Sequence, residues 1–263
     1  MFNEHIIFSS AWREEKTIVR INPERRSKAT ESKDLLTFKC RRMFKINDYS
    51  LYLVISEECA HPKHSKEIAS EAISGGVDII QMREKNKTQK ELISLGVILC
   101  KLCKANDKIF IVNDDAFVAK EVEAAGVHLG QEDMQKFSID STRKIVGSKT
   151  AIGLSTHSLK QFEEANDEEN VDYIAFGPVF ATKTKNYSIG TNDIEKVLER
   201  AVKPVFFIGG INLSNMDELL SLGAKNIALI RGILEAKDIK AQSAAFKKKL
   251  KERNVGYVNK NKR

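Results

Sequence analysis

Apolar and polar positions follow two alternating patterns from about residue 50 onward. Short runs of β-branched and other apolar residues are typical of buried strands, and between them apolar residues recur at the spacing of an amphipathic helix. The predicted strands are Leu51–Ile55, Ile79–Arg83, Lys108–Asn113, Gly126–Gly130, Ala151–Ser155, Tyr173–Val179, Val205–Gly210 and Ile227–Gly232. The predicted helices are Ser65–Ser74, Thr88–Ala105, Ala116–Ala125, Phe137–Ile145, Leu159–Asn166, Asp193–Ala201, Ser214–Leu222 and Lys240–Lys251.

Eight strand–helix units in about 200 residues favour an α/β fold, a single (β/α)₈ TIM barrel near the small end of that class. A doubly wound open sheet is the alternative, but such a sheet normally has fewer strands and one switch-point site. Residues 1–43 lack a sustained period. We therefore predict a flexible basic extension over residues 1–47, the catalytic barrel over 48–252 and a basic tail over 253–263.

The net charge of +7 sits at the two ends of the chain. Residues 1–43 carry ten Lys and Arg against six Asp and Glu, and residues 247–263 carry eight against one, so the body between them has a balance of −4. Such ends are more typical of solvated tails than of a nucleic-acid surface, although basic arms can hold polyanions. We expect neither nucleic acid nor a membrane as a partner.

The length of the apolar runs and the number of cysteines bear on the cellular location of the protein. The apolar runs are too short to cross a bilayer, and the first residues carry no long apolar core of a secretory signal. Four cysteines in 263 residues do not make a disulfide framework, so a cytoplasmic location is expected. Cys100 and Cys103 form a lone C-x-x-C inside a predicted helix, for which ordinary packing is expected.

If the fold is a (β/α)₈ barrel, its catalytic groups are expected at the carboxyl ends of the strands. At the end of the second predicted strand, alternation points Gln81, Arg83 and Lys85 the same way, provided the strand stays extended as far as Lys85. An amide and two cations on one side suit a polar heterocycle and its phosphates, whereas an ordinary charged loop is the alternative.

Acidic residues follow the third and fourth strands. Asn113-Asp114-Asp115 and Gln131-Glu132-Asp133 supply the hard oxygen ligands that Mg²⁺ prefers, with water and substrate phosphate completing its shell. Acidic residues also cap helices, and Asp115 fits that role. We predict Asp114 and Asp133 as the metal ligands and Mg²⁺ as the cofactor.

The remaining strand ends supply hydroxyls, a cation and glycines. Ser155 ends the fifth predicted strand without a triad partner, so hydrolase chemistry is not expected. His157 fits either an acid–base role or the start of a helix. The loop of residues 180–192, with Thr182, Thr184 and Lys185, is expected to act as a clamp. A phosphate cradle is predicted after the last two strands, at Gly209, Gly210, Ile230 and Arg231.

Two phosphate-binding regions with an acidic pair between them imply two phosphorylated substrates, at least one handled through a metal. A transferase that joins two phosphorylated molecules explains this better than a one-substrate isomerase does. No group stands out as a covalent nucleophile or as an assigned acid or base.

At this point the chain resembles the thiamine-phosphate synthase family over residues 50–250. The resemblance is carried by six motifs in order: Gln81-x-Arg83-x-Lys85, Val112-Asn113-Asp114, Gly126-Val127-His128-Leu129-Gly130-Gln131-Glu132-Asp133, Gly153-x-Ser155-x-His157, Gly177-Pro178 with Thr182-x-Thr184-Lys185, and Gly209-Gly210-Ile211. It implies a Mg²⁺-dependent transferase that joins 4-amino-2-methyl-5-(diphosphooxymethyl)pyrimidine to a thiazole phosphate, or its carboxylate form, and releases diphosphate.

The resemblance also implies residue roles. Gln81 and Ser155 would address the pyrimidine, and Arg83, Lys85, Asn113 and Lys185 would hold its diphosphate. The thiazole phosphate would face Thr182, Thr184, Gly210, Ile230 and Arg231, although the family often has a small hydroxyl residue at position 231. The related thiazole tautomerase is the alternative on the same barrel. His157 suits both enzymes, whereas the acidic pair Asp114 and Asp133, together with Lys85 and Lys185, favours the synthase.

Overall fold

The computed structural model describes residues 45–60, 62–132, 138–182 and 187–260, with side chains described up to residue 252. The chain divides into two units, residues 1–40 and 41–263, and the described residues belong to the second. The predicted boundaries of the extension and the tail therefore stay predictions.

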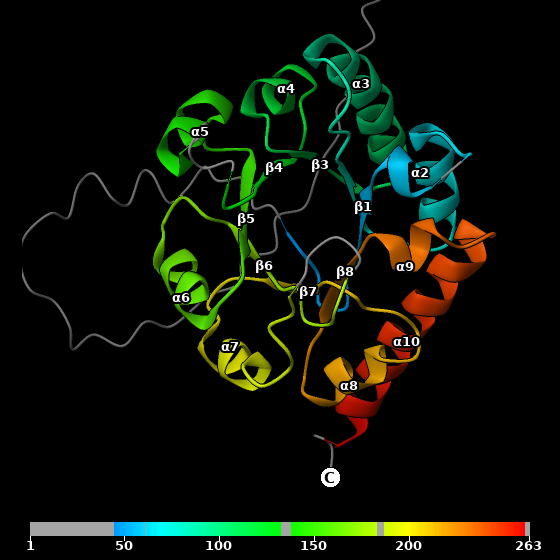
Figure 1. Ribbon diagram of the computed structural model, residues 1–263, viewed down its shortest axis with the longest axis vertical. Coiled ribbons are helices and arrows are strands. Elements are labelled where there is room, and N and C mark those ends of the chain that lie inside the picture. The colour runs from blue at the N-terminus through cyan, green and yellow to red at the C-terminus, as the bar shows by residue number, and fades with distance from the viewer. Residues whose placement is uncertain (1–44, 61, 133–137, 183–186, 261–263) are drawn as a thin grey trace, which may run out of the picture. The chain divides into compact units, whose positions relative to one another are not determined.

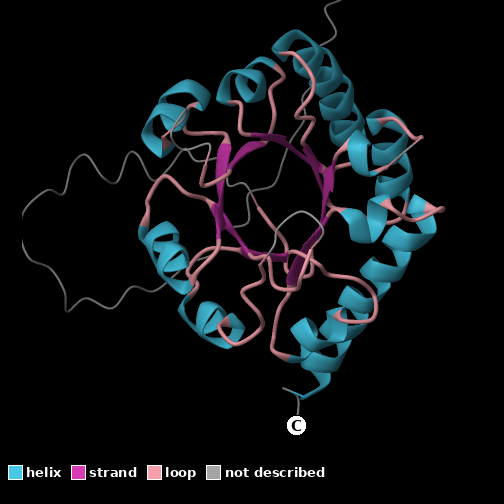
Figure 2. Ribbon diagram, in the orientation of Figure 1, coloured by secondary structure: helices cyan, strands magenta, loops and turns pink. Residues whose placement is uncertain are grey.

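Eight parallel strands form a closed barrel in chain order, because β1 pairs with both β2 and β8. Figure 2 shows them as a ring inside a layer of helices. This confirms the predicted (β/α)₈ barrel over the open sheet. The strands are β1 (Leu51–Ile55), β2 (Ile79–Met82), β3 (Ile109–Asn113), β4 (Gly126–Leu129), β5 (Ala151–Thr156), β6 (Tyr173–Phe176), β7 (Val205–Ile208) and β8 (Asn226–Leu229).

Helices follow the strands and cover the outside of the ring (Figure 1). Several begin at a side chain that caps them, such as Thr88, which forms a capping box with Glu91. The helical elements are η1 (Glu57–Cys59), α2 (Ser65–Ser74), α3 (Gln89–Ala105), α4 (Ala116–Glu121), α5 (Ile139–Val146), α6 (Leu159–Asp167), α7 (Ile194–Arg200), α8 (Met216–Ser221), α9 (Arg231–Leu234) and α10 (Ile239–Lys260).

The predicted element ends differ from the structure at the carboxyl side of the barrel. The predicted strand Ile227–Gly232 was too long, because β8 ends at Leu229 and α9 begins at Arg231. The strand predicted to reach Arg83 ends at Met82. After β8 the apolar Ile230 continues past the last pairing partner, so the sequence pattern alone extends that strand. After β2 the charged Arg83 follows directly, and its backbone N–H still donates to the Ile55 carbonyl at 2.9 Å.

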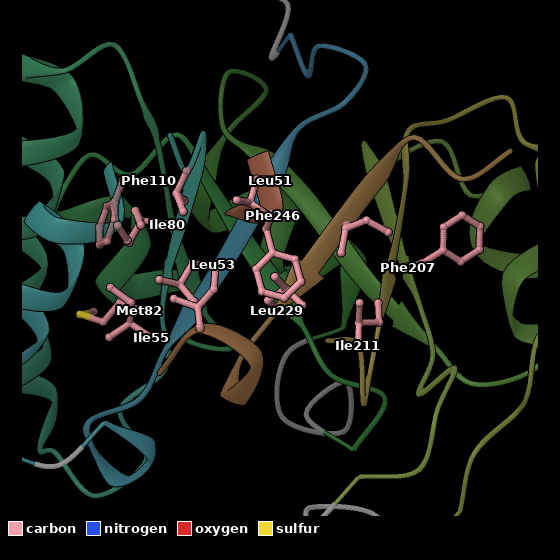
Figure 3. Close-up of a cluster of buried hydrophobic side chains, with 14 of the residues drawn as sticks. Leu51, Leu53, Ile55, Ile80, Met82, Phe110, Phe207, Ile211, Leu229 and Phe246 are labelled. Atoms are coloured by element: carbon pink, nitrogen blue, oxygen red, sulfur yellow. The ribbon is translucent and has the colours of Figure 1, made fainter. Parts of the chain in front are cut away.

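Strand side chains alternate between two buried clusters. Leu51, Leu53 and Ile55 of β1 belong to the large cluster between strands and helices (Figure 3), whereas Tyr52 and Val54 belong to a smaller one. The smaller cluster fills the barrel interior with residues from alternate positions of the strands, as the parity of a strand requires. Its members are Tyr52, Val54, Ile79, Ile111, Tyr173, Phe206 and Ala228.

Glycine makes room for the aromatic rings in the interior. A Cβ at Gly153 would overlap the ring of Tyr173, its partner in the register of β5 and β6. The Tyr173 ring therefore passes over β5 toward His128, which is the next residue in the same register row. This placement brings a phenol into contact with a group two strands away.

The final helix α10 packs against the outside of the barrel. The Phe246 ring is fully buried among the strand side chains (Figure 3), and Lys247 Nζ donates to Asp78 Oδ2 at 2.6 Å. The same carboxylate accepts from the Leu51 backbone N–H at 2.9 Å, so α10 is tied to the start of β1.

The C-x-x-C sequence is part of the packing of α3. Cys100 and Cys103 are buried free thiols, and burial raises the pKa of the Cys103 thiol to about 12. Such a thiol is a packing residue, in agreement with the expectation. In the described part of the chain, no helix combines the length and apolar character that crossing a membrane would require.

Replacing Phe246 with Ala should lower the free energy of unfolding by about 3–5 kcal/mol, because a fully buried ring is removed from the core. Val202→Ala is the control, since Val202 is 79% exposed and its change should cost within about 0.5 kcal/mol. Urea denaturation of both variants measures this. Equal midpoints would show that α10 does not belong to the cooperative core.

Candidate active site

The carboxyl ends of all eight strands lie on one rim, because the strands are parallel. Side chains from β2 and β3 meet at this rim. Gln81 Nε2 donates to Asn113 Oδ1 at 2.5 Å, and Asn113 Nδ2 donates to Asp114 Oδ2. Gln81 is only 3% exposed. Three predicted site residues are thus joined by direct hydrogen bonds.

Asp114 adopts an unusual backbone conformation, with φ of 62°. Asp tolerates this left-handed region better than most residues, and such strain is concentrated at functional sites. The backbone N–H of Asp114 donates to the His128 carbonyl at 2.8 Å, and Gly130 N–H donates to Asp114 Oδ1 at 3.2 Å. The carboxylate is therefore held between the ends of β3 and β4.

The donor set at this position suits a hard cation. Carboxylate oxygens of Asp114 lie beside the amide of Asn113, and oxygen ligands are what Mg²⁺ prefers. Among the residues that the structure describes, no group of three or more His, Cys, Asp or Glu could hold a metal by itself. The second predicted ligand, Asp133, lies outside the described residues.

Asp115 has a different role from its neighbour. Its side chain caps α4 by accepting from the Val118 backbone N–H at 2.9 Å. Adjacent carboxylates thus separate into one at the rim and one that stabilises a helix terminus.

Ser155 joins the rim through a buried polar cluster. Its Oγ lies 2.9 Å from His128 Nε2, and His128 Nδ1 lies 3.0 Å from the Tyr173 hydroxyl. Tyr173 contacts the Tyr52 hydroxyl at 3.1 Å, and Tyr52 donates to Gln81 Oε1 at 2.7 Å. Ser155 and Gln81 are therefore connected through the barrel interior.

Burial sets the protonation of this cluster. Desolvation lowers the pKa of His128 to about 4, because an imidazolium in the barrel interior would lose its hydration. Burial likewise raises the pKa of the Tyr52 and Tyr173 hydroxyls. All three groups are neutral near pH 7.

The residues after β2 depart from the predicted alternation. Lys85 is exposed and Arg83 is half-buried, whereas Glu84 between them is buried. Glu84 Oε1 accepts from the Ser65 hydroxyl at 2.7 Å, and both carboxylate oxygens accept from the Glu57 backbone N–H at 3.1 and 3.2 Å. Burial raises the pKa of this carboxyl. Glu84 therefore joins the loop after β2 to the loop after β1.

His157 precedes the N-cap of α6, in agreement with the helix-start role. Its Nδ1 donates to the Gly177 carbonyl at 2.5 Å, and its ring lies edge-on to Tyr187 at 6.3 Å. Gly177-Pro178 is a cis peptide at the start of the long loop. The half-buried Thr182 lies in this loop, whereas Thr184 and Lys185 lie outside the described residues.

The glycine pair after β7 packs against that same loop. Gly209 and Gly210 have φ values of 101° and 63°, and a Cβ at Gly210 would overlap the Ala181 carbonyl and Phe180. These positions therefore need glycine for both conformation and space. The Gly-Gly turn and the residues just before Thr182 are in direct contact.

Arg231 is the first residue of α9, and Ile230 is its N-cap. Arg231 Nη1 donates to Glu235 Oε1 at 2.9 Å, and this pairing raises the pKa of the guanidinium. The residue lines an open hollow of about 530 Å³ whose described lining comes from residues 231–242. Its guanidinium is thus engaged by a carboxylate of its own helix.

Comparison with known proteins decides the family. Residues 51–233 match the family model described as thiamine monophosphate synthase. The chain belongs to the thiamine monophosphate synthase family. The thiamine-phosphate synthase of Persephonella marina is 38% identical over 202 residues, which are 76% of this chain and 95% of that protein. The synthase of Halalkalibacterium halodurans is 38% identical over 215 residues, 80% of this chain and all of the relative.

A solved structure agrees with both. The thiamine phosphate pyrophosphorylase from Pyrococcus furiosus superposes with a TM-score of 0.71 at 34% identity, covering 78% of this chain and 96% of that one. The chain is therefore an enzyme of the transferase class, and the expected resemblance is confirmed. The thiazole tautomerase alternative is not favoured, since these relatives carry the names of the synthase reaction.

For this family member, the motif residues alone do not describe the site. Sequence reasoning missed Tyr52, Tyr173 and Glu84, and it quoted His128 within a motif without assigning it a role. The available signal was strand parity, because Tyr52 and His128 fall on the interior positions of β1 and β4. That signal becomes usable only when the register between strands is known.

Glu84→Ala should lower the free energy of unfolding by about 1–3 kcal/mol, because it removes the carboxylate that accepts hydrogen bonds from the buried Ser65 hydroxyl and the Glu57 N–H. Glu67→Ala removes an exposed carboxylate from the same region and should cost within about 0.5 kcal/mol. Thermal or urea denaturation compares the two. A Glu84→Ala protein as stable as the control would contradict the anchoring role.

Proposed function

We propose that this chain catalyses thiamine-phosphate synthesis at the rim formed by the carboxyl ends of the strands. It joins 4-amino-2-methyl-5-(diphosphooxymethyl)pyrimidine to a thiazole phosphate, with release of diphosphate. The observation that carries the proposal is the direct hydrogen-bonded series Gln81, Asn113 and Asp114, which sets a heterocycle-binding amide beside a metal-binding carboxylate.

The pyrimidine lies against Gln81 and Ser155. Both belong to rigid strands, and both are held by buried partners, so their positions are fixed before substrate binds. A preorganised amide and hydroxyl orient the ring with its methylene toward the Asn113–Asp114 side of the rim.

The diphosphate is held by Arg83, Lys85 and Asn113, together with Lys185 of the loop after β6. Asp114 and Asp133 hold Mg²⁺, which supplies stabilisation of negative charge on the leaving diphosphate. Lys85 is exposed on a loop that Glu84 anchors, so its ammonium is free to reach phosphate oxygens in solvent. The cations then offset charge that grows as the bond to the methylene breaks.

The thiazole phosphate lies at the turn after β7 and the start of α9. Backbone N–H groups near Gly210, Ile230 and Arg231 and the hydroxyls of Thr182 and Thr184 act as donors to its oxygens. The contact between Gly210 and residues 180–181 supports this grouping. Because the guanidinium of Arg231 is paired with Glu235, its backbone rather than its side chain supplies the main contact.

The reaction is dissociative. Diphosphate leaves, a pyrimidine-methyl cation forms, and the thiazole nitrogen captures it. Neither a general base nor a covalent nucleophile is needed. The neutral His128 and the two buried tyrosines agree with this, because they add no charge beside the cation. Bound substrates exclude water that would otherwise quench it. A cytoplasmic location remains part of the proposal.

The purified chain, incubated with both substrates, is expected to form thiamine phosphate only when Mg²⁺ is present. Chelation should stop turnover and added Mg²⁺ should restore it, as followed by chromatography of the product. A folded, Mg²⁺-loaded protein that forms no product would reject the proposed function.

Asp114→Asn should reduce kcat/KM by about 100-fold or more, because a metal-binding carboxylate becomes a neutral amide. The matched control is Asp115→Asn, the same change one residue later, in which Asn can still cap α4. That variant should stay within about twofold of the parent. Equal losses in both variants would contradict the assignment of Asp114.

A further inference from the structure

Seven side chains form one continuous series of hydrogen bonds across the top of the barrel interior. The series begins at Ser155, near the carboxyl end of β5, and ends at Asp114, just after β3. It crosses the ring by way of strands that are not neighbours in the sheet, since Tyr52 of β1 contacts Tyr173 of β6. In order, its members are Ser155, His128, Tyr173, Tyr52, Gln81, Asn113 and Asp114.

The Asp114 carboxylate fixes the direction of this series. An ionised carboxylate accepts hydrogen bonds and donates none, so Asn113 must turn its Nδ2 toward Asp114. The Asn113 Oδ1 then faces Gln81, which must donate through Nε2. The Gln81 Oε1 is left for Tyr52, which must therefore be the donor of that hydrogen bond.

The same reasoning continues through the two phenols. Tyr52 has one hydroxyl hydrogen, and Gln81 takes it, so Tyr173 must donate in the contact between the two hydroxyls. The Tyr173 hydrogen is then used as well. The hydrogen bond between His128 Nδ1 and the Tyr173 oxygen consequently requires a proton on Nδ1.

A neutral imidazole with its proton on Nδ1 has an unprotonated Nε2. That nitrogen can only accept, so the Ser155 hydroxyl donates to it across 2.9 Å. Burial keeps the ring neutral, since it lowers the pKa of His128 to about 4.

We propose that these seven groups form a hydrogen-bond chain of a single direction, in which Asp114 is the final acceptor and Ser155 the first donor. His128, Tyr173 and Tyr52 are positioning residues. They hold the Ser155 hydroxyl hydrogen away from the substrate, so that its oxygen meets the substrate as a hydrogen-bond acceptor.

This polarity selects the group on the pyrimidine that Ser155 binds, a consequence that rests on the proposed function. Both ring nitrogens of the aminopyrimidine are acceptors, and the exocyclic amine is its one donor group. Ser155 therefore recognises the amine. An analogue in which an oxo group replaces the amine would set an acceptor against an acceptor, and an unpaired polar contact in a half-buried site is costly.

The first experiment measures the tautomer of His128 without any substrate. The full chain is labelled with ¹⁵N-histidine, and its imidazole signals are recorded near pH 7. His128→Gln assigns the signal among the five histidines. The expected result is a protonated Nδ1 and an unprotonated Nε2. A proton on Nε2, or on both nitrogens, would overturn the proposal.

The second experiment asks whether Asp114 sets the direction. An asparagine can donate as well as accept, so Asp114→Asn is expected to add a population with the proton on Nε2 of His128. The matched change Asp115→Asn should leave the histidine signal as it is in the parent. An unchanged tautomer in the Asp114 variant would refute control by the carboxylate.

The third experiment uses the substrate and its oxo analogue. The parent should favour the aminopyrimidine diphosphate in kcat/KM, and Ser155→Ala should narrow that preference by about tenfold or more. Tyr173→Phe should also narrow it, because the ring of His128 loses the group that fixes its tautomer. Tyr49→Phe removes a hydroxyl that is not a member of the hydrogen-bond series, and it should preserve the preference for the aminopyrimidine diphosphate. A preference unchanged in Ser155→Ala would contradict amine recognition.

These readouts separate the two proposals. The tautomer measurement tests the hydrogen-bond chain even if the protein forms no thiamine phosphate. Conversely, an active enzyme with His128 protonated on Nε2 would keep the proposed function and reject the directed chain. If Tyr173→Phe does not fold, the parent tautomer and the Ser155 variant still decide the matter.

Discussion

Closure of the parallel sheet is the constraint on which the rest of the structure depends. Pairing of β1 with both β2 and β8 encloses an interior that has to be filled by alternate side chains. Large aromatics fill it here. The ring of Phe206 lies edge-on to those of Tyr52 and Tyr173, with centroids 5.1 and 5.9 Å apart. Gly153 supplies the space that this packing requires.

A layer of polar side chains lies next to these aromatic rings, toward the carboxyl ends of the strands. Because two of the three aromatic residues are tyrosines, their hydroxyls need partners once buried. The Tyr52 hydroxyl is hydrogen-bonded to Gln81 and the Tyr173 hydroxyl to His128, because closure of the barrel brings their strands close together. Packing and recognition are thus parts of one arrangement: the interior that stabilises the barrel also orients the amide and the hydroxyl that face the pyrimidine in the proposed reaction.

The loops add charge to this rigid layer. The proposed carbocation reaction needs charge stabilisation and exclusion of water more than proton transfer, which agrees with neutral groups in the interior and cations outside it. Glu84 illustrates how a loop is held, since its buried carboxylate connects the turns after β1 and β2 beside Lys85. Among the loops of the later strands, the Gly209-Gly210 turn packs against the residues that lead to Thr182.

The sequence alone determined the order of the elements, the barrel class and the family, because each follows from local patterns. Periodicity marks strands and helices, and the motifs stand in a fixed order along the chain. It also separated Asp114 from the helix cap Asp115, since capping is a local preference. It misplaced the end of β8, where apolar residues continue into α9.

The tertiary structure alone decided which polar groups meet. Whether Glu84 or Lys85 is buried depends on the neighbouring loop that supplies donors, and this is invisible in the motif. Tyr52, His128 and Tyr173 lie 45 or more residues apart in sequence, and only the register of closed strands brings them into contact. Hydrogen-bond direction is a property of the connected series, because each donor is fixed by what its neighbour has already accepted.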